Sequence, residues 1–251
     1  MKIESHMIQP FSPNVLPNEL LVELQSFLDS HDLVKLYEAY LWKNDVHYAG
    51  FPDIFRLELQ LGNHERVGGL TACDVKDVAR WGGLTKVNQI QCADLVLKPN
   101  TIYTQDGKPH PWLKDSITKP LVRLKEGIYK GIGPTYISKV LRFACPQEFG
   151  AIDTRCVRVF GDGDNKNKRH SWLNLHVRNS GRWFIPGYQE NWPSGYGRWI
   201  DILRYFAHNS PQNCPHPPQF VNQGLRSQNI WTCADVEMAL FTYASSVLKE
   251  K

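Results

Sequence analysis

The chain has 251 residues, and 29 Lys and Arg against 25 Asp and Glu give a formal net charge of +4. This length can bury one sizeable core or two small ones. A content of 42% hydrophobic and 12% aromatic residues excludes a disordered chain. Neither a run of about 18 apolar residues nor a basic region before an apolar segment occurs, so we expect no membrane span and no secretory signal. The mild positive charge permits a nucleic-acid partner without requiring one.

Residues 5–7, Ser-His-Met, resemble a cloning junction, which leaves open whether the native chain starts at Met1 or Met7. The six cysteines stand at long, irregular spacings, and an even number of them without a signal is typical of reduced thiols. We therefore expect a cytoplasmic protein, associated with the nucleoid if it is bacterial. No closely spaced cysteine set predicts a zinc ribbon or an iron–sulfur cluster. Cys214 and His216 are close, but the flanking Pro215 and Pro217 favour a turn, and we predict no metal site.

Hydrophobic spacing predicts short helices over the first 160 residues. Residues 16–43 repeat apolar side chains every three or four positions, with a break at Asp29 and Ser30 that can cap a second helix. Thr71 followed by Asp74 predicts a capping box. The other expected elements are an amphipathic segment at 52–61, a helix over 88–97, a loop over 98–112, helices over 117–129 and 135–144, and a helix from about 153 to 160.

Residues 161–196 have a different pattern. A turn signal at 161–165 is followed by two strand-like segments on either side of Asn179-Ser180-Gly181, which predicts an inserted β-hairpin. Helical spacing returns at 197–207 and 233–249, with a Pro-rich connection between them. The predicted fold is mainly α. Its expected parts are N-terminal helices in 1–50, a helical subdomain in 51–160, the insertion in 161–196 and C-terminal helices in 197–251.

The most informative segment runs from Leu124 to Gly161. Gly131-Ile132-Gly133 separates two predicted helices, and glycines on both sides of one apolar residue allow a tight turn with outward N–H groups. The helix that begins near Pro134 adds the positive end of its dipole, so the turn can hold a DNA phosphate without reading sequence. Lys130 and Lys139 flank the turn and can add phosphate contacts. An ordinary helix–helix connection also fits this pattern alone.

An aspartate downstream favours the DNA interpretation. The segment resembles the helix–hairpin–helix superfamily of DNA glycosylases, whose motif joins a Gly-[Val or Ile]-Gly hairpin to a Val-Asp-Thr segment. In that family 18 positions separate the aspartate from the position two after the second glycine, and 153 − 135 gives 18 here. The resemblance covers about 38 residues, 124–161. Its matching positions are Gly131, Ile132, Gly133, Val140, Leu141, Ile152, Asp153, Thr154, Val157, Arg158 and Val159.

The resemblance implies two helical subdomains with a DNA cleft between them, the terminal helices packing together. Asp153 is then the catalytic residue, which stabilises positive charge on the sugar of a flipped nucleotide and orients or deprotonates water. The hairpin through Thr135, with Arg155, is expected to contact DNA. Asp153 can also be a helix N-cap, and the two roles are compatible, since a capping carboxylate is fixed in direction. A binding module in which Asp153 only caps its helix is the alternative of another class.

Thr135 occupies the position where bifunctional members carry a lysine that forms a Schiff base. We therefore expect a monofunctional glycosylase that leaves an abasic site, with lyase activity through another lysine, such as Lys86, still open. Trp81, Tyr136 and Trp183 are candidates for the base pocket, although ordinary packing also fits each of them. Basic and aromatic residues interleave over 166–184, which suits a DNA-contacting insertion.

The expected partner is double-stranded DNA with one flipped base, bound by a monomer. The substrate stays open between a damaged, mismatched or modified base in DNA repair and a hypermodified, for example glucosylated, pyrimidine removed from phage DNA in antiviral defence. No cofactor is expected. In this family the hairpin often binds a monovalent cation through backbone carbonyls, and that alternative stays open.

Overall fold

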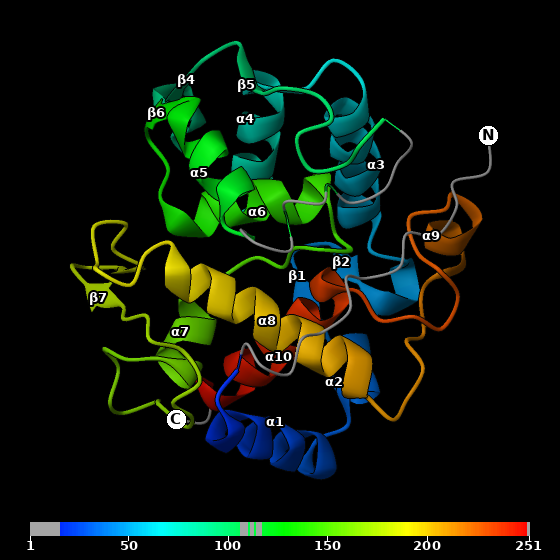
Figure 1. Ribbon diagram of the computed structural model, residues 1–251, viewed down its shortest axis with the longest axis vertical. Coiled ribbons are helices and arrows are strands. Elements are labelled where there is room, and N and C mark those ends of the chain that lie inside the picture. Colours follow the sequence, from blue (N-terminus) through cyan, green and yellow to red (C-terminus); the bar gives the residue numbers. More distant parts are fainter. Residues whose placement is uncertain (1–15, 106–109, 111–112, 114–116, 250–251) are drawn as a thin grey trace.

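The computed structural model describes residues 16–105, 110, 113 and 117–249, so Ser5 to Met7 lie outside the described residues (Figure 1). The described residues form ten α-helices and four separate two-stranded sheets, which makes the protein mainly α. No helix among them is both long and apolar enough to cross a membrane. The longer helices are α1 (Asn18–Ser30), α3 (Pro52–Arg66), α4 (Ala72–Trp81), α6 (Pro134–Ala144), α8 (Ser194–Asn209) and α10 (Cys233–Val247).

Short elements connect these helices. They are α2 (Leu33–Glu38), α5 (Lys119–Glu126), α7 (Thr154–Phe160), α9 (Pro218–Asn222) and the 3₁₀ turns η1 (His47–Ala49) and η2 (Val87–Gln89). Every sheet is one antiparallel pair. The pairs are β1 (Leu41–Trp42) with β2 (Asp45–Val46), β3 (Leu70–Thr71) with β5 (Leu95–Leu97), β4 (Gln91–Cys92) with β6 (Ile128–Lys130), and β7 (Arg178–Asn179) with β8 (Trp183–Phe184).

The helices pack in two groups, one above the other in Figure 1. In the upper group α3, α4 and α5 pack against α6. In the lower group α1 packs against α8, and α2, α7 and α8 pack against α10. The N-terminal and C-terminal helices therefore lie together. The sequence pattern grouped α7 with residues 51–160, and the structure packs α7 against α10. Its N-cap, Asp153, lies 3.5 Å from Lys139 on α6, so α7 begins where the two helix groups meet.

Side-chain caps explain where several helices begin. Thr71 and Asp74 form the predicted capping box at α4, and Asp153 caps α7. The cap of the second helix is displaced, however. α1 continues through Ser30, and the carboxylate that accepts a hydrogen bond from the Lys35 N–H, at 3.0 Å, belongs to Asp32. The helix expected up to residue 43 stops at Glu38, since the chain then turns into the β1–β2 hairpin.

The helix expected over 88–97 is wrong. This segment forms η2, β4 and β5, and its backbone pairs with β6 and β3, which are distant in sequence. A short apolar run has the same local appearance in a helix and in a buried strand, so periodicity alone cannot distinguish them. The loop expected from residue 98 is present over 98–105, and the residues after it are largely outside the described ones.

The predicted insertion contains a β-hairpin, at β7 and β8, with Asn179 opposite Trp183. It is shorter than the strand pattern indicated. Residues 172–177 do not extend this ladder. Their backbone hydrogen bonds join Leu173 to Phe160, and Leu175 and Val177 to Asp162, instead. The side chains of Trp172, Leu175 and Val177 are buried in the core.

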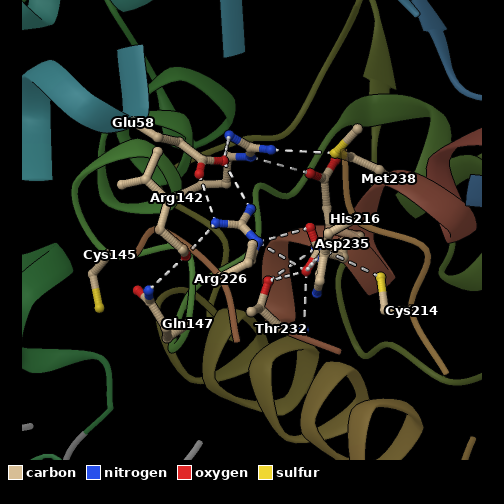
Figure 2. A network of polar contacts seen from close by, with 12 residues as sticks. Glu58, Arg142, Cys145, Gln147, Cys214, His216, Arg226, Thr232, Asp235 and Met238 are labelled. Carbon is tan, nitrogen blue, oxygen red and sulfur yellow. Dashed lines mark hydrogen bonds and ion pairs between the residues drawn. The ribbon is translucent and has the colours of Figure 1, made fainter. Parts of the chain in front are cut away.

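A buried network of charged side chains joins the two helix groups (Figure 2). Arg226, after α9, donates to both oxygens of Glu58 on α3, at 2.7 and 3.0 Å, and to Asp235 on α10, at 3.0 Å. Arg142 on α6 also donates to Glu58, at 2.7 Å. All four side chains are 1% exposed or less. Burial by itself would lower the pKa of Arg226, but Asp235 and Glu58 raise it above its usual value, so the guanidinium stays charged.

Removing one partner of this network should destabilise the fold strongly. Arg226→Met would leave Glu58 and Asp235 without their shared cation, and breaking a buried pair in this way costs about 3–5 kcal/mol. Arg56→Met is the matched control, since Arg56 lies 3.9 Å from Asp53 with half of its side chain exposed, and such a pair is worth less than about 1 kcal/mol. Denaturant unfolding of both variants measures the difference. Equal losses would contradict the role assigned to Arg226.

Candidate active site

Asp153 lies at the junction of the two helix groups, held by contacts to both of its carboxylate oxygens. Oδ1 accepts a hydrogen bond from the Arg155 N–H at 3.0 Å, which is the cap of α7. Oδ2 lies 3.5 Å from the Nζ atom of Lys139 on α6. The side chain of Asp153 is 14% exposed, so it is reachable but largely enclosed. One oxygen therefore fixes the direction of the carboxylate, and the other faces a cation.

Lys139 is enclosed by aromatic rings. Its Nζ atom lies 5.3 Å from the ring centroid of Trp42 and 5.5 Å from the ring centroids of Trp81 and Tyr136. We call these three rings the aromatic cage. These distances fit cation–π attraction. The Lys139 side chain is 8% exposed. The predicted phosphate contact would need an ammonium at the surface, whereas this one lies inside the protein beside Asp153.

Hydrogen bonds hold the three rings of the cage in place. Trp42 Nε1 donates to the backbone oxygen of Trp81 at 3.0 Å, and Trp81 Nε1 donates to Asp45 Oδ2 at 2.7 Å. The Tyr136 hydroxyl donates to the backbone oxygen of Gly82 at 3.2 Å. A Cβ atom at Gly82 would lie 2.6 Å from the Tyr136 ring, so a larger residue there would force the ring to move. Trp81 and Tyr136, both predicted pocket residues, are thus brought together and fixed.

Arg155 adds a second cation to the same side of the site. Its guanidinium lies 5.5 Å from the ring of Trp42 and 4.9 Å from that of Phe241 on α10. Arg155 is partly exposed, so the predicted DNA contact remains open to it. The site therefore places two cations near the carboxylate of Asp153.

The pKa of Glu237 on α10 depends on these charges. It lies 3.8 Å from Arg142 and is almost fully buried. Burial raises its pKa, with Asp153 acting in the same direction, while Arg142 and Lys139 partly offset the effect, and the result is a pKa of about 7. Near neutral pH this carboxyl group is therefore divided between its neutral and its charged form.

The glycine turn lies before α6. Gly131 has φ +98°, and a Cβ atom there would lie 2.8 Å from Ile90 Cα, so both conformation and space require glycine. Gly133 is the N-cap of α6 and has open space where its side chain would be. Pro134 begins the helix, and Lys130 at the end of β6 is exposed. The surface of the turn is thus free for a ligand, and the predicted phosphate contact remains a prediction.

The insertion borders the start of α6. A Cβ atom at Gly187 would lie 3.4 Å from Pro134, and the charge of Arg182 acts on Tyr136. Trp183, a predicted pocket residue, does not join the aromatic cage. Its ring instead lies 4.5 Å from the guanidinium of Arg158, which is paired with Asp164 at 2.7 Å.

The sequence interpretation missed Trp42 as a site residue. Trp42 lies 111 positions before Asp153, in a segment that was expected to be helical, and no local motif marks it. The position of Lys139 did indicate that it could belong to the site, because it lies four residues after Thr135 and therefore on the same face of α6.

A second cluster outside this site has the composition of a metal centre. Among the described residues, Cys214, His216 and Asp235 place their ligand atoms within 4.8 Å of one another. Figure 2 shows that the carboxylate of Asp235 already accepts hydrogen bonds from neighbouring side chains. Its Oδ2 accepts from the Thr232 N–H and hydroxyl at 3.1 and 2.6 Å and from Arg226 at 3.0 Å. A helix cap and an ion pair use these lone pairs, and the buried guanidinium of Arg226 lies beside them.

Comparisons of the chain with protein-family models, curated proteins and solved structures gave no match.

The pKa of Glu237 predicts a specific pH effect on stability. A carboxyl group with a folded-state pKa of about 7 and an unfolded value of 4.5 holds more protons when folded, so its contribution to the free energy of unfolding falls as pH rises from 4.5 through 7. Glu237→Gln removes this titration. Its free energy of unfolding relative to wild type should therefore rise by about 2–3 kcal/mol between pH 5 and pH 8. Denaturant titrations at both values measure it, and a difference independent of pH would refute the shifted pKa.

Proposed function

We propose that this protein is a DNA glycosylase that hydrolyses the N-glycosidic bond of a flipped nucleotide and leaves an abasic site. The observation that carries the proposal is the Asp153 carboxylate, fixed at the junction of the two helix groups and facing the aromatic cage. Its spacing from the glycine turn matches that of the helix–hairpin–helix glycosylases, and mainly α packing in two groups agrees with that superfamily.

In this proposal α5, the glycine turn at 131–133 and α6 form the helix–hairpin–helix motif. The helix predicted over 117–129 ends at Glu126, and the short strand β6 connects it to the turn. DNA lies along the junction of the two helix groups, with one phosphate at the N–H groups that begin α6. Lys130 and Arg155 add positive charge along the same path. The insertion next to Pro134 is then positioned to contact the strand that contains the flipped nucleotide.

The chemistry follows from a carboxylate beside the sugar. The flipped base stacks against the rings of the cage, because every base presents an aromatic face. Bond cleavage builds positive charge on C1′, which Asp153 stabilises more strongly than it stabilises the uncharged ground state. Asp153 then accepts a proton from the water that adds to C1′. Thr135 has no amine, so the residue at that position forms no Schiff base.

The alternative is a DNA-binding module in which Asp153 only caps α7, and the hydrogen bond from the Arg155 N–H supports that role. Asp153→Asn separates the two functions. Asparagine caps helices as well as aspartate does, so the fold and DNA binding should persist, while the negative charge is removed.

Base release tests the proposal. Duplexes carrying uracil, a thymine mismatch, 8-oxoguanine or alkylated purines, together with phage DNA containing glucosylated hydroxymethylcytosine, are incubated with the protein and analysed with and without alkali. We expect alkali-dependent breaks on at least one substrate and a loss of at least 100-fold in Asp153→Asn, within the range for a positioned acid or base.

The control for this experiment is Asp162→Asn, at an exposed aspartate paired with Lys168, which should retain wild-type activity. Activity of Asp153→Asn equal to wild type would exclude Asp153 as the catalyst. DNA binding without release of any base would favour the binding module. Breaks without alkali would show lyase activity.

A further inference from the structure

The position of Lys139 is unexplained by DNA binding alone. Its ammonium is buried, lies 3.5 Å from the carboxylate oxygen of Asp153 and is surrounded by the aromatic cage. Side chains on an α-helix point toward its N-terminus, which directs Lys139 back over the turn that contains Thr135. The chain thus places a cationic donor beside the carboxylate, one helical turn beyond the position of Thr135.

Building on the proposed function, we propose that Lys139 protonates the departing base and that the site therefore accepts electrically neutral bases, not cationic N-alkylated purines. The pyrimidine O2 and the purine N3 are next to the glycosidic nitrogen and so lie near C1′. When Asp153 faces C1′, the Lys139 ammonium, 3.5 Å from its carboxylate oxygen, lies within hydrogen-bonding reach of these atoms. Negative charge develops there as the bond breaks, and donors aimed at developing charge are the most effective.

The charge of the leaving base decides whether such a donor is needed. A neutral base takes both bonding electrons and leaves as an anion unless it receives a proton. A purine alkylated on a ring nitrogen already carries a positive charge and leaves neutral, so it gains nothing from Lys139. The cations of Lys139 and Arg155, both against the ring of Trp42, would also repel a cationic base.

The proposed steps conserve protons and electrons. The C1′–N bond breaks, its electron pair goes to the base nitrogen, and Lys139 Nζ transfers a proton to the base. Water adds to C1′ and gives one proton to Asp153. That proton then moves from Asp153 to the neutral amine of Lys139, across the contact that the structure shows, and both groups return to their starting state.

Rates on bases of different leaving ability test this role. Single-turnover release is measured from duplexes carrying uracil, 5-fluorouracil and 7-methylguanine, and from the most active neutral base of the wider set. Lys139→Gln should slow release of uracil and of that base by at least 100-fold. The loss should be at least tenfold smaller for 5-fluorouracil, a better leaving group. Wild type should release 7-methylguanine more slowly than uracil, and Lys139→Gln should not slow that release further. Lys139→Arg, which keeps a cationic donor, should restore part of the rate.

The outcomes separate this inference from the proposed function. Because the bases are compared within one variant, a general loss of folding would slow all of them equally, and such a uniform loss would overturn the role of Lys139. Wild-type preference for 7-methylguanine would overturn it too, as would a borohydride-trapped protein–DNA adduct that Lys139→Gln abolishes, since the amine would then attack C1′. Release of no base at all by wild type would refute the proposed function itself.

Discussion

The ion network of Glu58, Arg142, Arg226 and Asp235 is the constraint on which the rest of the structure depends. It joins α3 and α6 of one helix group to α10 of the other through side chains with almost no solvent exposure. A buried charge without its partner is costly, so the two groups can pack only in the arrangement that satisfies all four residues. An apolar contact would tolerate sliding between the groups, whereas these directional hydrogen bonds do not.

The packing of the two helix groups determines the geometry of the candidate site. Lys139 lies three residues before Arg142 on α6, while Asp153 begins α7, which packs against α10. The network thus sets the relation between α6 and α10, and with it the distance between the lysine and the carboxylate. Glu237, which lies near Arg142 and is influenced by Lys139 and Asp153, links the charge of the network to that of the site.

Sequence patterns predicted what depends on neighbouring residues. The capping box at Thr71, the N-cap at Asp153 and the helix over 135–144 are local, and all three are present. The region 88–97 was mispredicted because its strands pair with residues far along the chain. For the same reason, the sequence predicted two rings of the aromatic cage but not the third. Trp81 and Tyr136 lie near glycine motifs, but Trp42 reaches them through the fold alone, and the burial of Lys139 depends on all three.

The proposed function requires that the junction bind a sugar whose C1′ becomes positive beside Asp153. Affinity for a mimic of that state tests this requirement without knowledge of the base. Two duplexes are compared, one with a pyrrolidine in place of the sugar, cationic where C1′ would be, and one with a neutral tetrahydrofuran. We predict that wild type binds the cationic duplex at least tenfold more tightly and that Asp153→Asn loses this preference while keeping its affinity for the neutral duplex. Equal binding of both duplexes by wild type, or a preference unchanged in Asp153→Asn, would contradict the account.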